Sequence, residues 1–226
     1  MKDAFALAAK LAHDVIEKGK SLAIVLEELS KRKPAPFHAQ TKAMLFETLR
    51  WYYKLHFFAQ TLLEKPLKTK DVDIYALILI AIHQLHEKKN KEHAILSEAV
   101  EACMLLKKPW AKKLVNAILR KFQQEQASLT NKLDSNPAAF YSHPKWMLKK
   151  IQKDWPDRAE DILMANNQPP PMNVRLNTNK MREEEFISAL KEHGLDATQI
   201  SHTQSGYCLS QPLTTDKLPG FTKGAV

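Results

Sequence analysis

The chain contains two cysteines, Cys103 and Cys208, which are its candidates for a nucleophile, a disulfide or a thiolate metal ligand. They lie far apart and form no Cys-x-x-Cys pair, so neither a disulfide framework nor a zinc cluster is indicated. Cys103 stands between Ala102 and Met104 in an amphipathic helical pattern and is interpreted as a small core residue. Cys208 has no neighbouring proline or acidic partner and is also interpreted as structural. We therefore predict no catalytic residue in this chain, and a reducing, cytoplasmic setting fits.

Three histidines, His83, His86 and His93, could hold a metal ion. A spacing of three residues would place His83 and His86 on one face of a helix. No acidic or thiol ligand pattern accompanies them, so we expect no metal site.

Four polar residues on one predicted helix could bind phosphate groups: Lys112, Lys113, Asn116 and Arg120. Their spacing places them on one helix face, where the charges would bind phosphates and the amide would fix the register. The apolar residues Trp110, Leu114, Ile118 and Phe122 take another face and are predicted to pack inward. The alternative is a solvated polar face on which Asn116 hydrogen-bonds a neighbouring loop.

The net charge is positive and unevenly distributed, at +9 for the 226 residues. Residues 1–128 hold 22 Lys+Arg and 14 Asp+Glu, which leaves 12 and 11 for residues 129–226. The excess charge favours a polyanionic partner such as RNA for the first half, although a lysine-rich surface that only maintains solubility is the alternative. The longest apolar run, Ile74 to Ile82, is too short to span a bilayer, so no membrane partner is expected.

Other basic residues are candidates for RNA contact in less regular surroundings. Arg50 lies in an aromatic-rich stretch whose rings could stack on unpaired bases, but most of these rings are interpreted as core. Arg50 itself could reach RNA, or instead cap and pair with a nearby helix. Lys31, Arg32 and Lys33 form an exposed basic cluster at the C-terminal end of a predicted helix. These residues could contact RNA, but the favourable interaction of cations with the helix macrodipole would by itself explain the cluster.

The elements that position these residues are predicted to be helices throughout residues 1–128. Only five glycines occur, and Gly19 is the sole one before Gly194, which argues against a β-rich first half. Apolar residues repeat at three and four, and the segment 74–85 is apolar nearly all round, so it should be central. Proline and turn residues divide the region into about six helices, the third from Phe37 to Leu63 and the last from Pro109 to Gln126. This pattern predicts a compact helical bundle.

The second half is predicted to change character at residue 169. Residues 129–168 are interpreted as a helical connector, in which Ser142 caps a helix that starts at Pro144. Residues 172–176 and 207–209 have strand patterns, and a short helix from Glu183 to His193 ends at Gly194. We therefore predict a mostly α fold with three parts: a helical bundle (1–128), a helical connector (129–168) and a small, incomplete α+β segment (169–226).

Two segments of the first half, Phe46–Trp51 and Leu114–Arg120, resemble signatures of the NusB-like fold. That fold is an all-helical RNA-binding module, and with Ile82–Leu85 and Ala94–Val100 the resemblance covers about residues 1–128. It implies an RNA-binding bundle. A stand-alone adaptor of the antitermination type, which would bind RNA and a ribosomal protein, is one alternative. A helical protein-interaction domain is another, but it leaves the uneven charge unexplained.

The second half resembles the connector and first subdomain of the ribosomal RNA small-subunit methyltransferase B family, in Ser142–Met147, Asn166–Met172 and Arg175–Asn177. The resemblance implies methyl transfer from S-adenosylmethionine to C5 of a cytosine in 16S ribosomal RNA. It also matches Arg175 and Asn177 to a motif that faces RNA or the catalytic domain.

The chemistry of that family requires a cysteine thiolate to attack C6 of the ring, because C5 becomes nucleophilic only after this addition. Family members carry this cysteine, with a glycine-rich cofactor loop, in a domain that follows the region matched here. Neither element is found in this chain. We therefore expect it to bind and place ribosomal RNA, without binding the cofactor or transferring the methyl group by itself.

Overall fold

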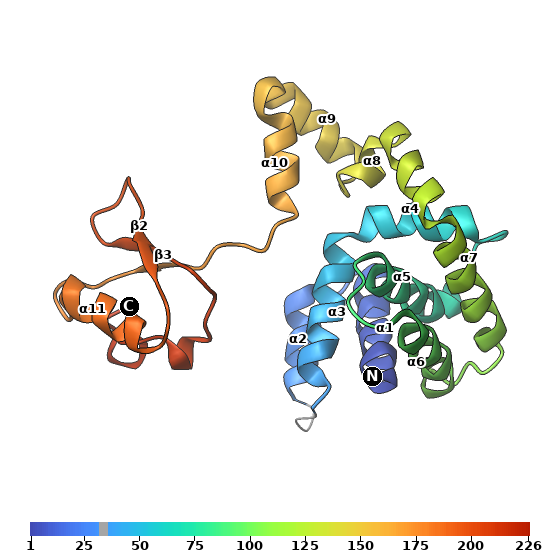
Figure 1. Ribbon diagram of the computed structural model, residues 1–226, viewed down its shortest axis with the longest axis horizontal. Coiled ribbons are helices and arrows are strands. Elements are labelled where there is room, and N and C mark those ends of the chain that lie inside the picture. The colour runs from blue at the N-terminus through green and yellow to red at the C-terminus, as the bar shows by residue number, and fades with distance from the viewer. Residues whose placement is uncertain (32–35) are drawn as a thin grey trace. The chain divides into compact units, whose positions relative to one another are not determined.

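The computed structural model describes residues 1–31 and 36–226, which form two compact units, Met1–Asn167 and Gln168–Val226 (Figure 1). Helices account for most of the described residues, and the only sheet among them has three short strands. The predicted mostly α fold with a small α+β segment is therefore confirmed. No helix in the described ranges is long and apolar enough to cross a membrane.

The first unit contains ten α-helices among its described residues. They are α1 (Lys2–Ile16), α2 (Leu22–Ser30), α3 (His38–Arg50), α4 (Tyr52–Leu62), α5 (Val72–His86), α6 (Glu92–Leu105), α7 (Ala111–Asn131), α8 (Pro137–Phe140), α9 (Lys145–Asp154) and α10 (Ala159–Asn166). Single 3-10 turns stand at Thr69–Asp71, Lys132–Ser135 and Pro156–Arg158.

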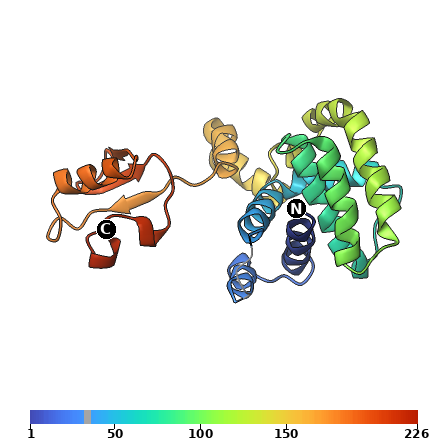
Figure 2. The ribbon, with the colours of Figure 1, turned by 60° about the horizontal axis from the view of Figure 1, so that its bottom comes forward.

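Helix α5 lies at the centre of the bundle. It contacts α1, α3, α4, α6 and α7, and eleven of its residues are buried. A helix that is apolar on every side must be surrounded by others, so the predicted central position is confirmed. Helix α1 packs closely against α5 and α6 because five of its buried residues are alanines: Ala4, Ala6, Ala8, Ala9 and Ala12. Figure 2 shows the same bundle turned by 60°.

The predicted single helix from residue 37 to residue 63 is wrong, because the chain leaves the helical conformation at Trp51. Trp51 has φ −97° and ψ 19°, and it separates α3 from α4. No proline or glycine marks this break. A tertiary contact lies at the break: the carbonyl oxygen of Arg50 accepts a hydrogen bond of 3.2 Å from the hydroxyl of Ser142. The donor comes from 92 residues further along the chain.

Ser142 does not have the capping role that was predicted for it. The N-cap position of α9 is Pro144, and no side chain caps this helix. Ser142 is instead buried with φ +54°, a left-handed conformation that is uncommon for serine. This turn directs its hydroxyl back to the end of α3, so a long-range hydrogen bond replaces the expected local cap.

A network of buried polar groups joins the turn before α9 to the end of α10; we call it the connector clasp. Asn167 Nδ2 donates to the carbonyl oxygens of Tyr141 (2.6 Å) and Leu163 (3.4 Å). His143 Nδ1 lies 2.5 Å from the Tyr141 oxygen, and Asn166 Nδ2 lies 3.3 Å from His143 Nε2. Helices α8, α9 and α10 are thereby held at defined positions within the first unit.

The second unit is a three-stranded antiparallel sheet with one helix. Strands β1 (Asn173–Arg175) and β2 (Ala197–Gln199) both pair with β3 (Gly206–Leu209), in the order β1-β3-β2. Helix α11 (Glu183–Glu192) runs beside the sheet (Figure 2), and 3-10 turns stand at Thr215–Lys217 and Phe221–Lys223. The sequence did not indicate β2, because Ala-Thr-Gln has no strand pattern of its own.

Candidate nucleic-acid interface

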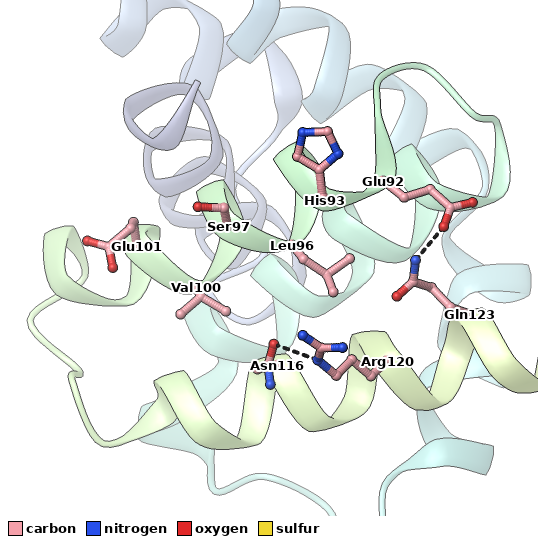
Figure 3. Close-up of a pocket in the computed structure, with 9 residues that line it drawn as sticks. All are labelled: Glu92, His93, Leu96, Ser97, Val100, Glu101, Asn116, Arg120 and Gln123. Atoms are coloured by element: carbon pink, nitrogen blue, oxygen red, sulfur yellow. Dashed lines mark hydrogen bonds between the residues drawn. The ribbon is translucent and has the colours of Figure 1, made fainter.

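Two of the four polar residues predicted on one helix, Asn116 and Arg120, line a groove between α6 and α7 (Figure 3). The groove has a volume of about 570 Å³. Helix α7 contributes Asn116, Arg120 and Gln123, and α6 contributes the opposite wall. The remaining lining residues are Glu92, His93, Leu96, Ser97, Val100 and Glu101. The groove therefore mixes both signs of charge.

Hydrogen bonds within the groove join residues along α7 and across to α6. Arg120 Nε donates to the amide oxygen of Asn116 over 3.4 Å, one helical turn away. Gln123 donates from its amide to Glu92 across the groove. Asn116 thus bonds Arg120 rather than a neighbouring loop, which was the alternative considered for it.

Lys112 is the member of this set whose charge is already partnered. Its Nζ lies 2.8 Å from Glu101 Oε1 on α6. The hydrogen bond and the positive charge of Lys112 lower the pKa of Glu101 below its ordinary value. An ion pair of this kind weakens the attraction of Lys112 for a phosphate, because Glu101 would repel it.

The exposed side of α7 carries a row of cations that we call the α7 row: Lys113, Arg120 and Lys121. Among residues 1–31 and 36–226, no carboxylate lies within 4 Å of these three charges. Their helical positions fall within an arc of about 100°, since each residue advances the helix by about 100°. Lys121 was not singled out from the sequence, although a full projection of α7 would have placed it on the same side as Lys113.

Trp110 was predicted to pack inward and does not. It precedes α7 and is 53% exposed, whereas Ile118 and Phe122 are buried and Leu114 is partly buried against the core. Trp110 is the N-cap residue of α7 and precedes its first helical residue. The helical spacing that predicts the direction of the other three apolar side chains therefore does not apply to Trp110.

The basic cluster after α2 is only partly described. Lys31 is the C-cap residue of α2, and its Nζ lies 2.7 Å from Glu27 Oε1, four residues earlier. Both side chains are well exposed, so this pair adds little to the stability of the fold. Arg32 and Lys33 lie outside the described residues.

Arg50 and the aromatic residues after it contribute mainly to the bundle. Arg50 is the last residue of α3, is partly buried, and uses its carbonyl group to bind Ser142. Phe58 is fully buried and Trp51, Tyr52 and Phe57 pack against the core, which confirms the core interpretation for most of these rings.

Arg175 and Asn177 line one hollow of about 390 Å³ in the second unit. Arg175 is exposed at the end of β1, where it pairs with Gly206. Asn177 has a structural role, because its backbone N–H donates to the Ala225 oxygen (2.9 Å) and its Nδ2 donates to the Gly224 oxygen (3.4 Å). This residue therefore fastens the last residues of the chain to the sheet.

His83, one of the three histidines considered as metal ligands, is buried among the core helices. It is 3% exposed, and burial lowers its pKa to about 4. Glu47 Oε2 lies 3.5 Å from His83 Nδ1. The loss of hydration outweighs the negative charge of Glu87, which raises the pKa, so the imidazole is neutral near pH 7. Within the described ranges, no group of three potential ligands is close enough to hold a metal ion.

The two cysteines have the structural positions that were predicted. Cys103 is fully buried in α6, and burial raises the pKa of its thiol to about 11. A thiol in this state is a poor nucleophile because the thiolate is scarcely populated. Cys208 is partly buried in β3, and both thiols are free.

Comparison with known families accounts for both halves of the chain. A model described as the NusB family matches residues 3–124, more than half of the chain. The chain belongs to the NusB family. A second model, described as the ferredoxin-like domain of RsmF/B-like methyltransferases, matches residues 143–216. The NusB-like module and the methyltransferase B region that the motifs indicated are therefore confirmed.

Curated relatives match nearly the whole chain. A protein of Coxiella burnetii named probable ribosomal RNA small subunit methyltransferase B is 36% identical over 219 residues, 97% of this chain and 50% of the relative. A Pseudomonas syringae protein named ribosomal RNA small subunit methyltransferase B is 38% identical over 184 residues, 81% of this chain and 41% of the relative. This NusB-family chain thus spans about half the length of the curated relatives it matches.

One solved structure, titled Crystal Structure of PH0851, matches with a TM-score of 0.63. The match covers 98% of this chain and 52% of that one, at 13% sequence identity. At this level of identity the likeness shows a shared fold.

Proposed function

We propose that this chain is the part of a bacterial ribosomal RNA small-subunit cytosine-5 methyltransferase that binds and positions 16S ribosomal RNA. The observation that carries the proposal is the order of two regions in one chain, a NusB-family bundle followed by an RsmF/B-like ferredoxin-like domain. A stand-alone antitermination adaptor has no need of the second region. The relatives that match across 97% of the chain carry methyltransferase names, which supports the same proposal.

We assign RNA binding in the first unit to the α7 row, with Asn116 beside it. The three cations of the row lack carboxylate partners among the described residues, so they can bind phosphates without breaking an ion pair. Lys112 takes a secondary role because Glu101 partly neutralises it. Lys31, Arg32, Lys33 and Arg50 are further proposed contacts in this unit, and Arg175 and Asn177 are proposed contacts in the second.

We assign the methyl transfer, with S-adenosylmethionine as its cofactor, to the half of the relatives that this chain does not match. The assignment is supported by the state of the two thiols. Cys103 is buried with a raised pKa, and among the described residues the sulfur of Cys208 forms no hydrogen bond with an acidic or basic group. We place the activity in the cytoplasm, where ribosomal RNA is made in bacteria.

Filter binding of 16S ribosomal RNA fragments at increasing salt concentration tests the proposal. We expect affinity to fall steeply with salt, because each phosphate contact releases bound counterions. The triple variant Lys113→Gln, Arg120→Gln, Lys121→Gln should lower the slope of log affinity against log salt by about 2. A matched control, Lys18→Gln, Lys20→Gln, Lys89→Gln, removes three lysines that are already paired with carboxylates. It should change the slope much less.

Two results would contradict the proposal. An affinity that does not depend on salt would exclude the phosphate contacts assigned to the α7 row. Calorimetry that detects S-adenosylmethionine binding to this chain would contradict the assignment of the cofactor to the other half of the relatives.

A further inference from the structure

Helix α9, in the connector of the first unit, has a polar side that is both basic and aromatic. We call it the α9 face, and it consists of Lys145, Trp146, Lys149, Lys150 and Lys153, all exposed. At about 100° per residue these five side chains fall within an arc of about 140°. The buried Leu148 and the partly buried Ile151 lie on the other side of the helix.

The charges of the α9 face are largely unpaired. Lys150 lies 3.1 Å from Asp154, four residues later. Among the described parts of the chain, no carboxylate lies within 4 Å of Lys145, Lys149 or Lys153. Three like charges on successive turns of one helix repel each other, so the face stabilises a bound polyanion more than it stabilises the helix.

Trp146 stands within this row of lysines and is 66% exposed, more than any other large apolar side chain described in the chain. An indole ring in water forgoes the free energy of burial that it would gain in a core. Rings placed among basic side chains are the platforms on which single-stranded nucleic acids stack their bases, while the charges follow the phosphates. The α9 face has both parts of such a platform.

The α9 face is presented on a fixed support. Leu148 is buried, and α9 packs against α10 and the 3-10 turn Pro156–Arg158. The connector clasp ties the turn before α9 to the last residues of α10 through Tyr141, His143 and Asn167. The side chains therefore do not have to be ordered from a flexible segment when a ligand binds, which lowers the entropic cost of binding.

We infer that the α9 face is a second RNA-binding surface, separate from α7, which takes an unpaired stretch of RNA. Lys145, Lys149 and Lys153 bind consecutive phosphates, and a base stacks on Trp146. This inference rests on the proposed function, since it assumes that the partner is RNA. An anionic membrane is the less suitable partner, because a helix that lies in a bilayer surface needs a broad exposed apolar side and this face offers one ring.

Substitution of Trp146 tests the stacking contact, with a short single-stranded RNA from 16S ribosomal RNA as the probe. Trp146→Ala should weaken binding about tenfold and Trp146→Phe should keep most of the affinity, since stacking needs an aromatic ring. Trp155→Ala is the matched control, because Trp155 is 60% exposed but stands at the non-helical C-cap position of α9, outside the α9 face. Equal losses for Trp146→Ala and Trp155→Ala would overturn the inference.

Substitution of the three lysines tests the phosphate contacts and separates the two proposals. The triple variant Lys145→Gln, Lys149→Gln, Lys153→Gln should lower the slope of log affinity against log salt by about 2. The corresponding triple Arg variant should keep the slope of the parent chain. If this triple Gln variant binds like the parent chain while the α7 variant loses affinity, the inference fails and the proposed function stands. If the parent chain does not bind RNA, both fail. Binding to phosphatidylglycerol vesicles that requires Trp146, with RNA binding unchanged, would also overturn the inference.

Discussion

The two units of this chain reach a folded state by different means. In the first unit, amphipathic helices pack around α5 and one apolar cluster extends from Ala4 to Ala139. The second unit has a core of seven buried residues around Phe186 and Tyr207, whose rings lie 5.6 Å apart. A unit of about 60 residues buries a smaller fraction of its surface and is correspondingly marginal. Local periodicity therefore builds the bundle, whereas the small unit depends on contacts between distant segments.

The end of the chain illustrates this dependence. The N–H of Asn177 donates to the oxygen of Ala225, and Ala225 is buried. Gly220 and Gly224 have φ of +82° and +66°, which lets the last turn bring Ala225 back to Asn177, two residues after β1. The apolar residues Leu176 and Leu218 then pack in one core although 42 positions separate them.

The largest effect that separates the units is expected from Phe186→Ala. Removing a buried ring costs about 3–5 kcal/mol, which is comparable to the stability that the core of so small a unit supplies. The second unit should therefore unfold while the first remains folded, as limited proteolysis and two-dimensional NMR of the whole chain would show. Phe221→Ala is the control, since Phe221 is 43% exposed. Loss of structure in both units together would show that they do not fold independently.

The stability of the first unit should decrease as the pH is lowered, because of His83. The pKa of His83 in the folded chain is about 4, below the ordinary value of 6.5. Above pH 6.5 the imidazole is neutral in both the folded and the unfolded chain, so its protonation does not change the free energy of unfolding there. Between pH 6.5 and 4 the unfolded chain binds the proton first, and the free energy of unfolding should fall by about 3 kcal/mol.

Chemical denaturation of the parent chain and His83→Gln at several pH values measures this effect. The variant should lose part of the pH dependence but not all of it, because burial also lowers the pKa of His56 and His86. An unchanged pH dependence in His83→Gln would show that His83 is not the buried titrating group.

A smaller effect is expected at the connector clasp. Asn167→Ala removes the hydrogen bonds to Tyr141 and Leu163 and should cost about 1–2 kcal/mol. The loss should be local, with faster amide hydrogen exchange in α9 and α10 and unchanged exchange in α5. Gln168→Ala, at the exposed position next to Asn167, serves as the control. Equal acceleration in α5 would show that the connector and the bundle unfold as one.

The smallest effect on stability is expected when a glycine with positive φ is replaced by alanine in each unit. Gly19 and Gly194 have φ of +63° and +69°, and a Cβ atom at either position meets no atom within 4 Å. Each glycine→Ala variant should therefore cost about 1 kcal/mol from backbone strain alone. We expect a clear loss of stability in the second unit for Gly194→Ala, and a minor shift in the first unit for Gly19→Ala. Thermal melts followed by NMR signals of each unit would measure both.

Much of the fold could be predicted because it follows from local periodicity. The apolar pattern of residues 74–85 indicated a central helix, and the structure places α5 there. Gly194 was predicted to end a helix, and it does so with Gly194 N–H bonded to the Lys191 oxygen and Leu195 N–H bonded to the Leu190 oxygen. The strand β2 could not be found this way, since it is a strand only because β3 supplies its hydrogen-bond partners.

The candidate site was less predictable than the fold. Helical spacing placed Lys112, Asn116 and Arg120 on one side of α7. It could not show that Glu101 pairs with Lys112, because that carboxylate belongs to a different helix. The α9 face was within reach of the same spacing argument, but its segment was interpreted only as a connector.

The order of residues within single segments was enough to indicate which segments are helical, which helix is central and which family the chain resembles. The break at Trp51, the role of Ser142 and the identity of the cations that remain free to bind a polyanion became evident only from the folded chain. A hydrogen bond or an ion pair depends on the positions of two groups in space, which no single segment specifies. Arg50 and Ser142 lie 92 residues apart, and folding alone brings them together.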